Sequence, residues 1–239
     1  MNTRSDLPHT EKHPNAVAGL LKRAGAVAIF PVLMAVILFL AAGRVDWTWA
    51  WVYMGINLAN VLFLGPITIR TTTETVAERG ELKITEKWNE VGSAFYLLAM
   101  YIALPLVAGL DLRFGAGRDL SIGWHVAGAA VLAVGLGLTA WAMIKNAYMW
   151  SAVPIQLGQT VCSTGPYRFV RHPGYLGLIL QALGVPILLG SLWALIPGIT
   201  AAVCMIIGTS LEDCMLQAEL PGYQDYVQKV RFRLVPGIW

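Results

Sequence analysis

The residues best suited to chemistry gather in one polar stretch between two apolar segments. Residues 163–177 read STGPYRFVRHPGYLG and combine arginines, a histidine and tyrosines. Pro173 suits the first turn of a helix, because its missing N–H costs nothing there. His172 is therefore expected near the start of that helix, where free N–H groups and the positive dipole end favour an anion such as a carboxylate.

A second chemical feature is the acidic pair Glu212 and Asp213, which directly follows an apolar run. An ionisable group at membrane depth is energetically costly, so this pair is a candidate for function. Pro221-Gly222 is expected to end the helix that carries it, and the tyrosines and basic residues beyond indicate an amphipathic segment on the membrane surface. Both features also have a structural interpretation. The arginines near His172 could only hold the topology, and the acidic pair could be ordinary exposed charge.

The elements that position these residues are expected to lie in a membrane. Of the 239 residues, 56% are hydrophobic and 13% are charged, whereas about a quarter of a soluble domain is charged. A soluble fold of this composition would leave large apolar patches in water. The net charge of +3 is too small to indicate nucleic acid as a partner. The three cysteines lack the spacing of a metal site, so neither a metal nor a disulfide is expected.

Six apolar stretches predict an all-α, polytopic transmembrane helical bundle with five to six spans. The first four have the roughly 20 residues that a helix needs to cross a hydrocarbon core of about 30 Å. The last two are shorter, are separated only by Gly190-Ser191, and are expected to form a helical hairpin. The stretches cover approximately residues 24–42, 47–69, 91–110, 122–144, 174–190 and 191–209.

The distribution of basic residues predicts a multi-pass protein with both termini in the cytoplasm. With the N-terminus inside, the cytoplasmic segments would be 1–23, 70–90, 145–173 and 210–239. These segments carry 14 of the 17 lysines and arginines, as the positive-inside rule requires. The polar stretch and the end of the acidic helix then share the cytoplasmic face.

The polar stretch and the C-terminal region together resemble the isoprenylcysteine carboxyl methyltransferase family. The resemblance rests on residues 163–177, followed by LEDCML, PGYQDY and VRFRLVPGIW near the C-terminus. It covers roughly residues 146–239, and the first four spans are similar only in hydropathy. It implies that residues 146–239 bind S-adenosylmethionine near the cytoplasmic face and carry out catalysis. Residues 1–145 would supply the N-terminal transmembrane helices of the same integrated membrane domain.

The resemblance also implies the residues of the site. The expected catalytic residues are His172, Glu212 and Arg171. The expected cofactor contacts are Gln156, Gln159, Thr160, Val161, Cys162, Tyr167, His172, Pro173, Gly174, Tyr175 and Glu212.

One position departs from the family pattern. Gly208 stands one helical turn before the acidic pair, where relatives commonly have an arginine that is implicated in positioning the methyl acceptor. A carboxylate acceptor would then need its positive charge from Arg168 or Arg171 in the loop. Asp213 is a milder change, because many relatives have a second glutamate there.

The expected function is S-adenosylmethionine-dependent methyl transfer to a lipophilic or lipidated acceptor, such as an isoprenylcysteine-like carboxylate, that enters from the bilayer. A carboxylate needs no base, whereas a phenol, thiol or amine must lose a proton, and His172 or Glu212 is the nearest base. Two alternatives stay open. One is a membrane sterol reductase-like enzyme that uses NADPH, and the other is a non-catalytic membrane binding protein, which Gly208 favours. Membrane lipids are the expected partners, and the sequence fixes neither the acceptor nor the oligomeric state.

Overall fold

The fold is a bundle of long helices, seen in a computed structural model that describes residues 31–77, 87–115, 120–146, 148–149, 155 and 158–239. The described part of the chain contains helices and connecting turns and no strand. The helices are Pro31–Ala42, α2 (Thr48–Ala77), α3 (Lys87–Leu98), α4 (Leu104–Phe114), α5 (Ile122–Lys145), α6 (Pro173–Leu189), α7 (Leu195–Glu219) and α8 (Tyr223–Lys229). A π-helical segment η1 (Ala99–Ala103) joins α3 to α4, and a 3-10 turn η2 (Gly165–Arg168) precedes α6. The all-α prediction is confirmed.

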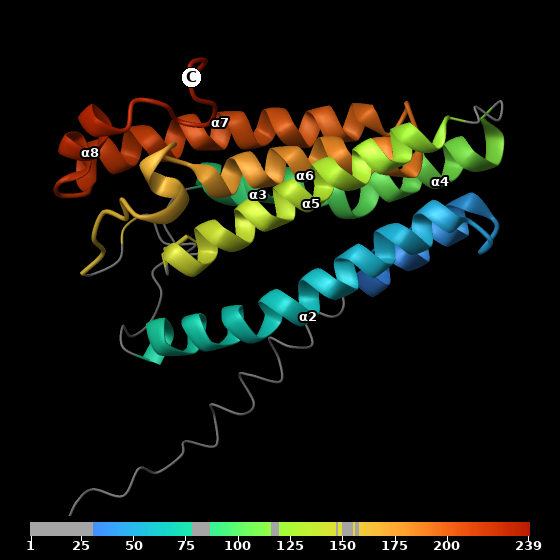
Figure 1. The fold of residues 1–239 in the computed structure, drawn as a ribbon, viewed down its shortest axis with the longest axis horizontal. Helices are drawn as coiled ribbons and strands as arrows, with labels where there is room; N and C mark the ends of the chain where they lie inside the picture. Colours follow the sequence, from blue (N-terminus) through green and yellow to red (C-terminus); the bar gives the residue numbers. More distant parts are fainter. Residues whose placement is uncertain (1–30, 78–86, 116–119, 147, 150–154, 156–157) are drawn as a thin grey trace, which may run out of the picture.

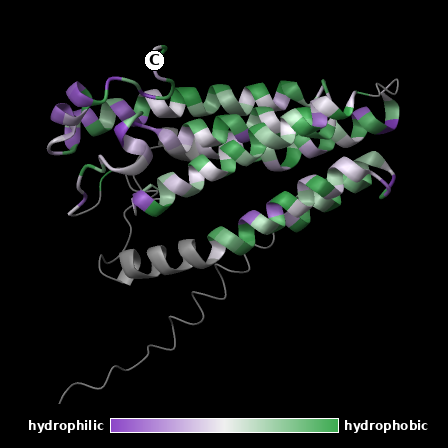
Figure 2. Ribbon diagram, in the orientation of Figure 1, coloured by the Kyte–Doolittle hydropathy of each residue, from purple (hydrophilic) through white to green (hydrophobic). Residues whose placement is uncertain are grey.

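The bundle has the surface of a membrane protein. Three helical segments are long and apolar enough to cross a membrane, namely Gly92–Phe114, Ile122–Lys145 and Leu195–Glu219, among the described residues. Only about a third of the second and third of these is buried inside the protein (33% each), so their outward faces suit lipid. Hydrophilic residues gather at the ends of the bundle and are densest around α8 (Figure 2). A helical membrane bundle is confirmed, whereas the number of passes and the side of the termini stay predictions.

The continuous segment from α3 to α4 widens at η1 because of a proline. Pro105 lies in the first turn of α4 and has no N–H to donate to the carbonyl one turn earlier. The N–H of Leu104 instead reaches back to the carbonyl of Ala99, which is the wider π pattern. A proline inside this span is therefore accommodated by a local π-bulge.

Helix α6 is the central helix and contacts α2, α4, α5 and α7. Its closest neighbour is α5, because glycines bring the two backbones together. A Cβ on Gly128 of α5 would lie 2.2 Å from the backbone nitrogen of Leu188, and one on Gly177 of α6 would lie 2.7 Å from the carbonyl oxygen of Gly135. Small residues at such contacts are typical of helix packing in membranes. The pairing fixes how far the N-terminus of α6 projects at the end of the bundle.

The turn between α6 and α7 confirms the predicted helical hairpin. Gly190 has a φ of +75°, and a Cβ there would lie 2.6 Å from the ring of His125, so a residue without a side chain is required. Ser191 accepts the N–H of Ala194 (3.1 Å) and donates to Asp111 of α4 (2.6 Å). These bonds delay the start of α7 to Leu195, four residues later than the apolar pattern suggested.

Candidate active site

The segments that carry the predicted site residues meet at one end of the bundle. Helix α6 begins there, α7 ends there, and α8 and the η2 turn lie beside them (Figure 1). We call this the α8 end. The chain after α8, residues 230–239, which we call the tail, turns back along α7 (Figure 1). Residues far apart in sequence are therefore assembled by the packing of α6 against α7.

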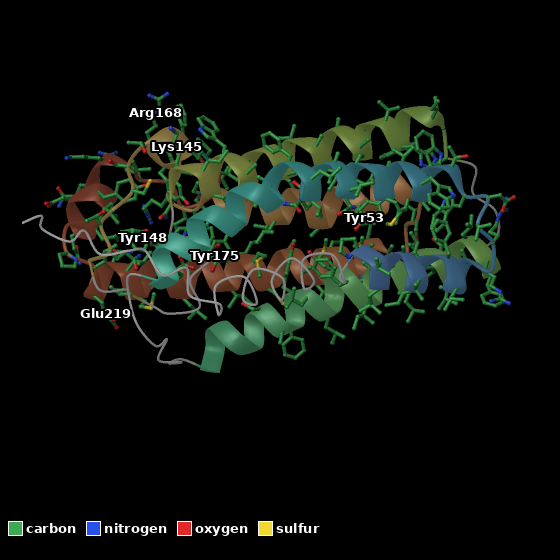
Figure 3. The ribbon with its side chains drawn as sticks, turned by 90° about the horizontal axis from the view of Figure 1, so that it is seen from below. Tyr53, Lys145, Tyr148, Arg168, Tyr175 and Glu219 are labelled. Carbon is green, nitrogen blue, oxygen red and sulfur yellow. The ribbon has the colours of Figure 1, made fainter. Side chains whose placement is uncertain are left out.

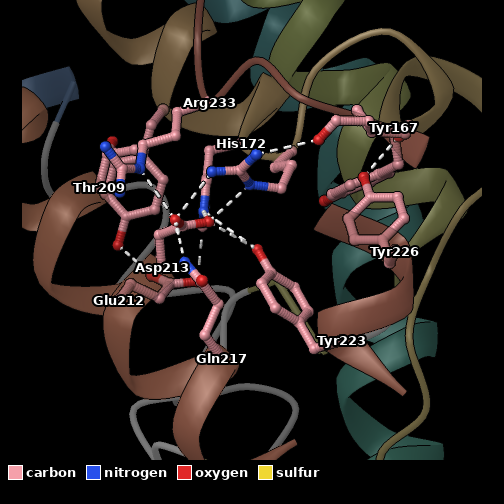
Figure 4. Close-up of polar contacts among 12 residues, drawn as sticks. Tyr167, His172, Thr209, Glu212, Asp213, Gln217, Tyr223, Tyr226 and Arg233 are labelled. Atoms are coloured by element: carbon pink, nitrogen blue, oxygen red, sulfur yellow. Dashed lines mark hydrogen bonds and ion pairs between the residues drawn. The ribbon is translucent and has the colours of Figure 1, made fainter. Parts of the chain in front are cut away.

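Asp213 is the centre of a closed polar network, although its side chain is completely buried (0% exposed). Both of its oxygens are held by Arg171, through Nε (2.7 Å) and Nη2 (2.9 Å), which is a bidentate ion pair. The remaining donors are Arg233 Nε (2.8 Å), Gln217 Nε2 (2.7 Å), Tyr223 OH (3.0 Å) and His172 Nε2 (3.1 Å). Figure 4 shows Gln217 of α7, Tyr223 of α8, Arg233 of the tail and His172, the residue before α6, pointing toward this carboxylate. Asp213 is thereby fully satisfied by the protein itself.

Arg171 connects this network to the tail. Its Nη1 donates to the carbonyls of Val230 (2.9 Å) and Arg231 (2.8 Å), while Nε and Nη2 bind Asp213. Burial lowers the pKa of Arg171, but its hydrogen bonds to Asp213 and the charge of that carboxylate outweigh burial and leave the pKa raised. Arg171 therefore stays charged, and its described contacts are with the network and the tail.

Backbone hydrogen bonds join the loop before α6 to the tail as well. The N–H of Arg171 donates to the carbonyl of Phe232 (2.9 Å), and the N–H of His172 donates to that of Arg233 (2.9 Å). These bonds use backbone groups that would otherwise be buried without partners. They hold His172 in place at the start of α6.

The orientation of His172 follows from its partner. Asp213, held between Arg171 and Arg233, is ionised and can only accept hydrogen bonds. For the neutral form of the ring, we therefore assign the proton of His172 to Nε2, which faces Asp213 at 3.1 Å. Nδ1 then carries a lone pair and lies 4.0 Å from Oε1 of Glu212.

Glu212, His172 and Tyr175 form a second cluster, which we call the Glu212 group. The phenol of Tyr175 donates a short hydrogen bond to Glu212, and the Tyr175 ring meets the His172 ring edge-on at 5.9 Å. The side chain of Glu212 is 31% exposed. This carboxylate can therefore accept further hydrogen bonds from a bound molecule.

Among the residues that the structure describes, no side chain caps the start of α6 next to this group. Its first N–H groups are thus available to an acceptor. A Cβ on Gly174 would lie 2.2 Å from the terminal methyl of Met149, so the flexible end of a methionine covers the backbone here. A flexible side chain can give way to a ligand more easily than backbone can.

A pocket of about 280 Å³ opens on the other side of η2, between the end of α5 and the loop before η2. We call it the loop pocket. Asn146 at its edge donates to the hydroxyl of the buried Tyr167 (3.4 Å), and Cys162 donates to the carbonyl of Lys145 (3.3 Å). Burial raises the pKa of Tyr167, so its hydroxyl is neutral. The residues that line the loop pocket are Lys145, Asn146, Tyr148, Thr160, Val161, Cys162, Ser163 and Thr164.

The predicted site residues fall into three places. Thr160, Val161 and Cys162 line the loop pocket, with Gln159 half-buried just before them. His172, Pro173, Gly174, Tyr175 and Glu212 lie around the start of α6, and Tyr167 is buried between the two places. Arg171 belongs to the Asp213 network, and Gln156 lies outside the described residues.

The network around Asp213 was not predicted as a unit from the sequence, which indicated Asp213 only as part of a functional acidic pair and as a substitute for a second glutamate. Gln217 follows Asp213 by four residues on α7, a spacing at which helical side chains meet. Nothing in the spacing of Tyr223 and Arg233 predicts that they reach the same carboxylate. One signal in the sequence could have pointed to this network, namely the energetic cost of a carboxylate at membrane depth. A carboxylate inside an apolar helix needs cationic partners, and arginines stand in the two flanking polar segments.

Comparison with known proteins assigns the region that contains this geometry. Residues 124–220 match the family described as phospholipid methyltransferase. The matched range runs from α5 through α7 and includes both the Glu212 group and Asp213. The prediction of a membrane methyltransferase is confirmed at this level, and the match begins earlier than residue 146, where the sequence resemblance began.

A second match covers more of the chain and leaves function open. The chain is 25% identical over 169 residues to the uncharacterized protein YpbQ of Bacillus subtilis (strain 168). The match covers 68% of this chain and 95% of that protein. The similarity therefore extends over about two thirds of the chain, while the name of that protein states no activity.

Proposed function

We propose that this membrane methyltransferase uses S-adenosylmethionine and methylates a lipophilic acceptor at the Glu212 group. The observation that carries the proposal is the partly exposed carboxylate of Glu212, which lies with His172 and Tyr175 beside the uncapped start of α6. On the basic-residue asymmetry of the sequence, the α8 end faces the cytoplasm. The water-soluble cofactor would then reach this end directly.

The residues present suit the chemistry of the cofactor. The uncapped N–H groups at the start of α6 suit its carboxylate, and the carboxylate of Glu212 suits its hydroxyl or ammonium groups. The loop pocket beside Tyr167 offers a mixed polar and apolar wall for the base. Gly174 permits a close approach to the backbone once the end of Met149 moves.

Bound S-adenosylmethionine supplies an electrophilic methyl group on a sulfonium. The protein's own contribution is to align the acceptor with that methyl group and to exclude water. His172 is held by Asp213 with its Nδ1 lone pair toward Glu212. Nδ1 can therefore take up the proton from a methyl acceptor that has to be deprotonated, such as a phenol, thiol or amine.

The electrostatics of the described residues favour an acceptor that is not a carboxylate. Arg171 and Arg233 both bind Asp213, and Arg168 stacks over the Phe169 ring at 5.2 Å on the exposed surface. Glu212 contributes negative charge, which would repel a second carboxylate. We therefore favour an amine, phenol or thiol on a lipid that enters from the bilayer. Methylation of an isoprenylcysteine carboxylate would contradict this preference.

Calorimetry on the detergent-purified protein tests the cofactor assignment. We expect S-adenosylmethionine to bind the wild type, and His172→Ala and Glu212→Ala to lose binding. Glu219→Ala is the matched control, because Glu219 is an exposed carboxylate further along α7 (Figure 3), and its substitution should leave affinity unchanged. Unchanged binding in both site variants, or retention of NADPH in preference to S-adenosylmethionine, would overturn the proposal.

A further inference from the structure

A second pocket lies beside the Asp213 network. It has a volume of about 450 Å³ and is formed by the end of α7, α8 and the tail. We call it the tail pocket. None of the residues of the Glu212 group lines it. Its lining residues are Arg171, Gln217, Val227, Arg231, Phe232, Arg233, Ile238 and Trp239.

The tail pocket carries an excess of positive charge. Three arginines line it, whereas the neighbouring network contains one carboxylate, Asp213, to which Arg171 and Arg233 are already bound. Counting a terminal carboxylate at Trp239 still leaves one positive charge in excess. Arg231 is exposed, and its carbonyl rather than its guanidinium takes part in the network. The guanidinium of Arg231, together with the Arg233 nitrogens that do not bind Asp213, can therefore donate to an anion with several oxygen acceptors, such as a phosphate.

An apolar surface lies along the face of α7 that ends at this pocket, with Ser210 and the buried Asp213 between the last exposed isoleucine and the pocket. Ile199, Val203 and Ile206 of α7 are 51%, 46% and 41% exposed and follow one face of the helix. Gln217 lies 18 residues after Ile199, which is five full turns at 3.6 residues per turn, so the same face ends at the tail pocket. Ile238 on the pocket wall is 81% exposed. The anion site is therefore the polar end of an apolar track.

The tail also carries the residue types that are found at the headgroup region of a membrane, namely the indole of Trp239 and the arginine packed on it. The guanidinium of Arg233 lies over the Trp239 ring, 4.9 Å from its centroid. Three backbone N–H groups, those of Arg233, Leu234 and Val235, donate to the main-chain oxygen of Trp239 (2.9, 3.1 and 3.3 Å). Tryptophan and arginine both favour the headgroup region. The tail thus forms a fixed wall of the pocket rather than a loose end.

We propose that the tail pocket binds the phosphate of a membrane phospholipid, whose acyl chains lie along the exposed face of α7. This lipid is distinct from the methyl acceptor, because Asp213 and its partners separate the tail pocket from the Glu212 group. Bound lipid holds the tail against α7 and so stabilises the Asp213 network. The site goes beyond the proposed methyl transfer and does not depend on it.

Lipid titration of the full-length protein in neutral detergent tests this site. Phosphatidylglycerol should bind in native mass spectra and raise the apparent Tm, whereas diacylglycerol with the same chains and inorganic phosphate should do neither. Arg231→Gln should weaken phosphatidylglycerol binding about tenfold, the value of one charge-assisted hydrogen bond. Ile238→Ser provides a second variant that leaves the arginines in place, and it should also weaken binding.

Arg168→Gln is the matched control, since Arg168 is an exposed arginine at the same end but outside the tail pocket. It should bind phosphatidylglycerol as the wild type does. The proposal is overturned if Arg231→Gln and Arg168→Gln weaken binding equally. It is also overturned if inorganic phosphate binds as tightly as phosphatidylglycerol, or if Ile238→Ser binds the lipid unchanged.

Discussion

Glu212 and Asp213 are neighbouring carboxylates on α7, and their surroundings differ in almost every respect. Asp213 is completely buried and binds two arginines, while the Glu212 side chain is 31% exposed and binds Tyr175. One residue along a helix is a rotation of about 100°. That rotation turns Asp213 toward the tail and Glu212 toward the open side at the start of α6.

The two carboxylates therefore have different roles, a structural one for Asp213 and a chemical one for Glu212. Asp213 has no capacity left for a ligand, because its oxygens already accept from arginine, glutamine, tyrosine and histidine donors. Glu212 has that capacity. His172 touches both residues, since Nε2 faces Asp213 and Nδ1 faces Glu212. Asp213 therefore positions the residue with which Glu212 acts.

Asp213→Asn should produce the largest effect on stability. It leaves Arg171 and Arg233 without a charged acceptor in a buried site, which lowers the free energy of unfolding by about 3–5 kcal/mol. Chemical denaturation in mixed micelles measures this change. A variant as stable as the wild type would show that Asp213 is not the structural centre of the α8 end.

Glu212→Gln should give the opposite pattern. Its affinity for S-adenosylmethionine should fall about 10- to 100-fold through the loss of charge-assisted hydrogen bonds. Its free energy of unfolding should change by less than about 1 kcal/mol, because the side chain is partly exposed. Calorimetry and denaturation on the same preparation provide both values. A large loss of stability with normal affinity would reverse the roles assigned to the two carboxylates.

Arg171→Lys sharpens the structural half of the comparison. A lysine cannot bind Asp213 through two parallel N–H groups and also reach the carbonyls of Val230 and Arg231. We expect a loss of about 1–3 kcal/mol and faster proteolysis of the tail. Limited proteolysis followed by mass spectrometry measures the release, with Arg168→Lys as the exposed control. If the tail were equally protected from proteolysis in both variants, the contacts of Arg171 would not be what holds the tail in place.

The smallest expected effect concerns pH. Burial raises the pKa of Tyr226, whose hydroxyl donates to the carbonyl of Tyr167. An unfolded tyrosine ionises near pH 10, so the buried phenol contributes stability that is complete below about pH 10 and is lost as the pH rises through the higher folded value. The apparent Tm of Tyr226→Phe should therefore fall less steeply than that of the wild type above about pH 10. Parallel curves would show that Tyr226 is not protected by burial.

Hydropathy predicted the bundle because membrane helices satisfy their own backbone, and the apolar lengths follow from bilayer thickness. The α6–α7 hairpin could also be predicted, because only Gly190-Ser191 separates the last two apolar stretches. Features that depend on tertiary contacts could not be predicted. Glycines of α5 and α6 set the closest helix contact, and Ser191 shifts the start of α7 through a bond to Asp111. Such contacts join residues that no local pattern connects.

For the site, the sequence predicted that His172 and Glu212 belong together, and the structure places them 4.0 Å apart. It assigned Arg171 to catalysis, and the structure places that side chain against Asp213 and the tail. Sequence reasoning places charged residues near one another but does not say which carboxylate a given arginine chooses. That choice depends on the rotation of α7 and on the path of the tail.

Methyl transfer by the purified protein tests the central claim most directly. Labelled S-adenosylmethionine would be offered with membrane lipid extract, a phospholipid amine or a farnesylated cysteine, to the wild type and to His172→Gln. The wild type should label an amine, phenol or thiol lipid, identified by mass spectrometry, and His172→Gln should label almost none. Absence of label from every lipid, in a protein that binds the cofactor, would contradict a methyltransferase that acts at the Glu212 group.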